Sequence, residues 1–84
     1  MDNIKVFYKI FEPGYYAIFR VAGQYYYASL AVNADGHNTE VMIFKWNDNQ
    51  ISFGDALGEY RKRDVDFTPD ALRDCIEEFT ESLS

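Results

Sequence analysis

The spacing of apolar residues changes once along this 84-residue chain. Up to about residue 53, apolar and polar residues alternate in short runs separated by turn residues, which is typical of antiparallel strands. From residue 68 the spacing becomes helical, with one apolar side made of Leu72, Cys75, Ile76, Phe79 and Leu83. One helix can cover only one face of a sheet, so the pattern predicts an α+β fold. We expect an antiparallel β-meander of four to five strands packed against one C-terminal amphipathic α-helix.

Turn residues set the expected boundaries of the strands. Pro13-Gly14, Ala22-Gly23 and the cluster Asn33-Ala34-Asp35-Gly36 separate the predicted strands, because these residue types favour turns. The predicted strands are 4–11, 15–21, 24–32 and 39–46, with a short fifth strand at 50–53. The chain is short enough for one domain, residues 1–84. Within it we expect the β-meander at 1–53, an irregular loop at 54–67 and an acidic helix at 68–83.

The expected helix begins with strong signals. Thr68 is a good N-cap, Pro69 suits the first helical position, and Asp70 favours the positive end of the helix dipole. The net charge of -6 comes entirely from this end of the chain, because acids and bases cancel over residues 1–63. The acidic side chains predicted opposite the apolar side are Asp70, Asp74, Glu77, Glu78 and Glu81.

This acidic surface is our first candidate binding site. Carboxylates near the C-terminal end of a helix oppose its dipole, so helix stability alone does not explain them. A row of carboxylates resembles a row of phosphates, so the surface could occupy a basic groove that normally holds DNA or RNA. The expected partner is therefore a protein with a basic surface, such as a nucleic-acid-binding protein.

The sheet face away from the helix is the second candidate. On the first strand, Ile4, Val6, Tyr8 and Ile10 are expected towards the helix, and Lys5, Phe7, Lys9 and Phe11 away from it. On the third strand, either Tyr25 and Tyr27 or Tyr26 must point outward. An uncovered aromatic face suggests a partner or a homodimer. The candidate residues of this face are Phe7, Phe11, Tyr25 and Tyr27.

The same aromatic residues raise the question of nucleic-acid binding. Tyr25, Tyr26 and Tyr27, with Phe7 and Tyr15, could form a stacking platform beside Lys5, Lys9, Arg20 and Lys45. The acidic net charge argues against it, since nucleic acid and anionic lipid both repel negative surfaces. We therefore expect no direct contact with nucleic acid or membrane.

No catalytic, cofactor-binding or metal-binding motif is recognisable. His37 lies in a turn beside Asp35, without a second histidine or a cysteine nearby to complete a site. Cys75 shares the apolar side of the helix and has acidic neighbours, which favours a buried thiol over a nucleophile. Arg61-Lys62-Arg63 is flanked by Glu59, Asp64 and Asp66 and is interpreted as a solvated loop that pairs with these acidic neighbours.

These patterns favour a small, acidic, non-catalytic protein-binding module without a cofactor. One cysteine and no apparent signal peptide or membrane span indicate a cytoplasmic location. Inhibitors from phages and mobile elements, such as anti-restriction and anti-CRISPR proteins, have this general style, and a nucleic-acid mimic is the specific hypothesis. Two alternatives remain: a homodimeric structural or accessory domain, and a small enzyme or ligand-binding domain with a pocket between sheet and helix.

Overall fold

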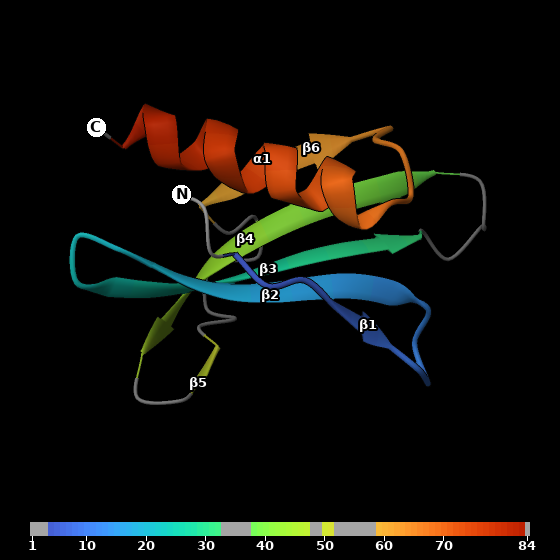
Figure 1. Cartoon of the computed structure of the whole chain (residues 1–84), viewed down its shortest axis with the longest axis horizontal. Coiled ribbons are helices and arrows are strands. Elements are labelled where there is room, and N and C mark those ends of the chain that lie inside the picture. Colours follow the sequence, from blue (N-terminus) through green and yellow to red (C-terminus); the bar gives the residue numbers. More distant parts are fainter. Residues whose placement is uncertain (1–3, 33–37, 48–49, 52–58, 84) are drawn as a thin grey trace.

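The computed structural model describes residues 4–32, 38–47, 50–51 and 59–83 (Figure 1). Its strands form one antiparallel sheet, in which β1 to β5 are neighbours in chain order and β6 pairs with β4. The elements are β1 (Phe7–Lys9), β2 (Gly14–Val21), β3 (Gln24–Val32), β4 (Thr39–Asn47), β5 (Gln50–Ile51), β6 (Tyr60–Arg63) and α1 (Pro69–Ser82). The predicted α+β fold, an antiparallel meander with one C-terminal helix, is confirmed.

The hairpin between β2 and β3 shows why the central strands were predictable. Ala22 and Gly23 both have positive φ values, 50° and 83°. Two such residues make the tight turn whose twist matches that of the flanking strands. Val21 pairs with Gln24 across this turn, and the register continues along both strands to Gly14 and Ala31.

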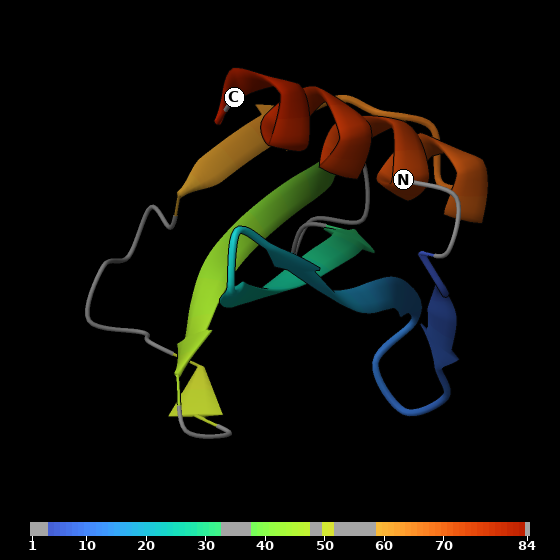
Figure 2. The ribbon, with the colours of Figure 1, turned by 60° about the vertical axis from the view of Figure 1, so that its left-hand side comes forward.

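Helix α1 begins as predicted. The Thr68 hydroxyl accepts a hydrogen bond from the Ala71 N–H at 3.1 Å, and Pro69 occupies the first turn. The helix lies across β2, β3 and β4 on one side of the sheet (Figures 1 and 2). In the part of the chain that the structure describes, no helix is both long and apolar enough to cross a membrane.

The core lies between α1 and the sheet. Four buried helix residues, Leu72, Cys75, Ile76 and Phe79, meet sheet residues that alternate along the strands. The sheet residues are Ala17, Phe19, Tyr26, Ala28, Leu30, Val41 and Ile43. Leu83 was expected on the apolar side, but it caps the helix and is 48% exposed, since the last turn extends past the packed region.

The prediction of an irregular loop over 54–67 is wrong at β6. Tyr60 pairs with Ile43 and Arg63 pairs with Glu40, so this segment adds a strand beside β4. The pairing with β4 and the packing of Tyr60 against the core hold this charged segment in place. Its three basic residues pair with carboxylates on both sides of the sheet. Val65 and Phe67, which follow the strand, pack against the core.

The first strand is shorter than predicted. Only Phe7–Lys9 pairs with β2, and the chain turns over residues 10–13. Ile4 and Val6 pack against the core as expected. Tyr8 and Ile10 were expected there too, but both are exposed. Tyr8 is exposed because β1 lies at the sheet edge, beyond the strands that α1 covers, and Ile10 because it lies in the turn after β1.

Candidate binding surfaces

The acidic surface of α1 consists of Asp70, Asp74, Glu77, Glu78 and Glu81. All five residues are exposed, on the side of the helix opposite its buried residues. Asp70, Asp74, Glu77 and Glu81 are spaced by four, three and four positions, so they form a single row about 16 Å long. Glu78 lies at the border of this row, on the side facing β6.

Asp70 and Glu78 of this surface pair with cations. Arg73 lies 3.0 Å from Asp70 on the same helix, and Lys62 of β6 lies 3.3 Å from Glu78. Such exposed pairs contribute little to stability, typically about 0.2–1 kcal/mol. The last turn of α1 contains no basic residue, so its carboxylates meet the negative end of the helix dipole.

The opposite side of the sheet, here called the open face, presents side chains that point away from α1. An aromatic ladder crosses it from β1 to β3. The rings of Phe7 and Tyr16 are 5.3 Å apart, those of Tyr16 and Tyr27 are 5.9 Å apart, and both pairs are nearly parallel. Tyr27 faces Phe44 of β4 in the strand register, which extends the aromatic row across a fourth strand.

Cationic side chains lie close to aromatic rings of the open face. The Lys9 ammonium lies 5.8 Å from the Tyr16 ring centroid and 5.3 Å from that of Tyr27. The Arg20 guanidinium lies 5.5 Å from the Tyr25 ring. These distances are typical of cation–π interactions.

At the other margin of the open face, Arg61 and Arg63 flank Glu40. Arg61 donates a hydrogen bond to the Glu40 carboxylate, and Arg63 lies 3.8 Å from the same oxygen. Glu40 is mostly covered, with 17% of its side chain exposed, whereas Arg63 is 62% exposed. Two guanidinium groups around one carboxylate leave this margin positively charged.

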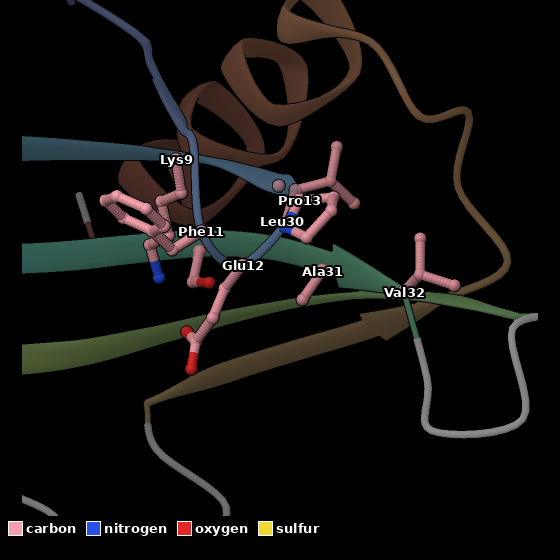
Figure 3. Close-up of a pocket in the computed structure, with 9 residues that line it drawn as sticks. Lys9, Phe11, Glu12, Pro13, Leu30, Ala31 and Val32 are labelled. Carbon is pink, nitrogen blue, oxygen red and sulfur yellow. The ribbon is translucent and has the colours of Figure 1, made fainter.

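A pocket of about 410 Å³ opens where β1 turns into β2. Figure 3 shows Phe11, Glu12 and Pro13 of the turn on one side and Ala31 and Val32 of β3 on the other. Gly14, Ser29 and Ala31 are small, so the sheet backbone comes close to the pocket. A Cβ added at Gly14 would lie 2.6 Å from the Leu30 carbonyl oxygen, so the close approach of the strands requires glycine.

Three of the four predicted sheet-face residues lie on the open face. Phe7 and Tyr25 are about half exposed, Tyr27 is partly buried in the ladder, and Tyr26 points into the core. Phe11 is not on a strand but in the turn at the pocket, where it is 96% exposed. Tyr16 was not among the predicted residues. Its alternation with the buried Ala17, together with its pairing with Phe7 in the strand register, places it on the open face.

The buried thiol belongs to the core. Burial raises the pKa of the Cys75 thiol, and burial also raises the pKa of Tyr60, helped by the neighbouring Cys75 and Glu78. The Tyr60 hydroxyl is shielded from solvent and has no hydrogen-bond partner among the described residues. Both groups are therefore held in their neutral forms at ordinary pH.

Asp35 and His37 lie outside the described residues. Within residues 4–32, 38–47, 50–51 and 59–83, no group of three or more His, Cys, Asp or Glu side chains could hold a metal ion.

Comparison of the chain with protein-family models, curated proteins and solved structures found no match.

Proposed function

We propose that the chain is a small non-catalytic binding module that binds a basic protein through the acidic surface of α1. The observation that carries this proposal is the division of the helix into two sides. The side with Leu72, Cys75, Ile76 and Phe79 is used entirely in the core. The carboxylates opposite it are exposed, and they include residues that weaken the helix through its dipole.

Repulsion between neighbouring carboxylates supports the same interpretation. Asp74 is followed by Glu77 and Glu78 at the spacings where helical side chains meet, and Glu81 follows both at the same spacings. Like charges at these spacings each cost about 0.2–0.5 kcal/mol. A surface that costs stability in the free protein is explained if cations of a partner neutralise it on binding.

The specific form of this proposal is an inhibitor that mimics nucleic acid, of the kind that phages and mobile elements use. Its partner would be a cytoplasmic nucleic-acid-binding protein whose basic groove accepts the row of carboxylates. The row on α1 is straight and about 16 Å long, so it would fill only a short part of such a groove.

The test is affinity capture from the native host with wild-type protein and with an Asp74→Asn/Glu77→Gln variant. A control variant, Asp64→Asn/Asp66→Asn, removes the same amount of charge outside the helix. The proposal predicts a captured protein that is lost with the first variant, kept with the control and eluted by added nucleic acid. Equal capture by all three proteins would contradict it.

A further inference from the structure

The expectation that this chain avoids nucleic acid rested on its net charge, and the structure distributes that charge unevenly. On the described part of the open face and its turn, four cations lie near the carboxylates Glu12 and Glu40. The cations are Lys9, Arg20, Arg61 and Arg63. The five acids of α1 lie on the other side of the sheet, with the core between them and the open face (Figure 2).

Two of these cations, Lys9 and Arg20, lie next to aromatic rings. Lys9 contacts Tyr16 and Tyr27 of the ladder and also lines the pocket, so it connects the two features. Phe7 and Tyr25, near the two ends of the aromatic region, are each about half exposed. Rings on a sheet accept stacked bases, and adjacent cations accept phosphates.

The pocket adds a place for one base. Its volume of about 410 Å³ falls within the range of small-ligand sites. Phe11, Glu12 and Ser29 are among the lining residues, so the pocket has an exposed aromatic ring and polar side chains available to a base. Lys9 at the rim is placed for the phosphate of the same nucleotide.

We infer that the open face binds single-stranded nucleic acid, with bases on the aromatic ladder and in the pocket and phosphates on the surrounding cations. A second copy of this chain docked face to face would bring two sets of these cations together, so charge complementarity favours a polyanion. Exposed bases are needed for stacking, so a single strand fits this face better than a duplex does.

The experiment measures fluorescence anisotropy of short labelled oligonucleotides with the full chain at low salt. Single-stranded RNA, single-stranded DNA and a duplex of the same sequence are titrated in parallel. We expect either or both single strands to bind more tightly than the duplex. Binding should fall steeply between about 50 and 200 mM salt, as counterion release requires. Comparison of the RNA and DNA arms shows which sugar the face prefers.

The variant Lys9→Glu/Arg20→Glu tests the face itself. It should weaken binding at least about tenfold, because each cation lost removes a phosphate contact. The matched control is Lys62→Glu/Arg73→Glu, which makes the same charge change on the helix side and should alter binding by less than about twofold. Cooperative thermal melts establish that both variants are folded.

An NMR titration of the wild-type protein gives an answer that does not depend on the variants. Shifts at Phe7, Tyr16, Tyr25 and Ser29 on adding the oligonucleotide support the inference. The inference is overturned if none of the oligonucleotides binds, or if both charge variants weaken binding equally. Light scattering that shows a dimer, with these same residues shifting on dilution, also overturns it and assigns the face to a second copy. The acidic surface of α1 is untouched by the open-face variants, so the proposed function stands or fails separately.

Discussion

The Phe79 ring stands edge-on to the Tyr26 ring, with their centroids 5.0 Å apart and their planes at 75°. The same ring lies 6.1 Å from Phe19 and 6.0 Å from Tyr60. This one side chain therefore joins α1 to β2, β3 and β6. Edge-to-face aromatic pairs add about 0.5–1.5 kcal/mol beyond the burial of their area.

Replacing Phe79 by alanine should lower the free energy of unfolding by about 3–5 kcal/mol, the usual cost of deleting a buried aromatic ring. Urea denaturation followed by circular dichroism measures the change. Leu83→Ala, at the exposed end of the same helix, is the control and should cost less than about 1 kcal/mol. Similar losses in both variants would contradict the assignment of the core.

The N-cap makes a second prediction about α1. Thr68→Ala removes the acceptor of the Ala71 N–H and should cost about 1 kcal/mol, whereas Thr68→Ser keeps the hydroxyl and should cost less. Thermal melts of both variants give the comparison. An alanine variant as stable as the serine variant would mean that the hydroxyl does not cap the helix in solution.

Gly14 tests the close approach of β2 and β3 at the pocket. A methyl group there meets the Leu30 carbonyl, so Gly14→Ala should destabilise the protein by about 1–3 kcal/mol. Ser29→Ala, which lines the same pocket without adding atoms, is the control and should change stability little. Chemical denaturation measures both, and a neutral Gly14→Ala would disprove the predicted clash.

The pH dependence of stability follows from the buried thiol and phenol. Burial raises the pKa of Cys75 above its ordinary value of 9.0, and that of Tyr60 above its ordinary value of 10.0. As the pH rises above about 9, these groups ionise more readily in the unfolded chain than in the folded state. The stability they contribute is therefore complete below about pH 9 and decreases as the pH rises above it.

Urea melts from about pH 7 to about pH 10.5 measure this effect. The free energy of unfolding should fall above about pH 9, and Cys75→Ala should make the fall less steep because one ionising group is gone. The comparison uses the slope and not the absolute stability, which the loss of the side chain also changes. An unchanged slope in Cys75→Ala would show that the thiol is not held neutral.

The sequence predicted the central strands and the helix because their signals are local. Turn residues such as Ala22 and Gly23 ended β2 and began β3, and Thr68 with Pro69 began α1. The edges of the sheet depend on distant contacts, and there the predictions failed. Alternation placed Tyr8 and Ile10 inward, but α1 packs over β2, β3 and β4 and leaves Tyr8 exposed, and Ile10 is in the turn after β1.

Strand β6 was missed for a related reason. Its residues Arg61, Lys62 and Arg63 carry no apolar pattern, and their partners Glu40 and Glu78 lie far away in the chain. The open face was predicted from Phe7, Tyr25 and Tyr27. Lys9 and Arg20 were already named beside the predicted aromatic residues. Arg61 and Arg63 emerged only with the register, which places them opposite Met42 and Glu40 on the side away from α1.

The central proposal is that the acidic surface of α1 binds a basic protein, and its most direct test uses the partner identified by capture. Isothermal titration compares wild-type protein with a variant in which four helix carboxylates become amides. The substitutions are Asp74→Asn, Glu77→Gln, Glu78→Gln and Glu81→Gln. The proposal predicts that the variant remains as stable as the wild type or becomes slightly more stable, because like-charge repulsion is relieved. It also predicts that binding is abolished and that wild-type binding weakens steeply as salt is added. Binding that is insensitive to salt and survives all four substitutions would contradict the proposal.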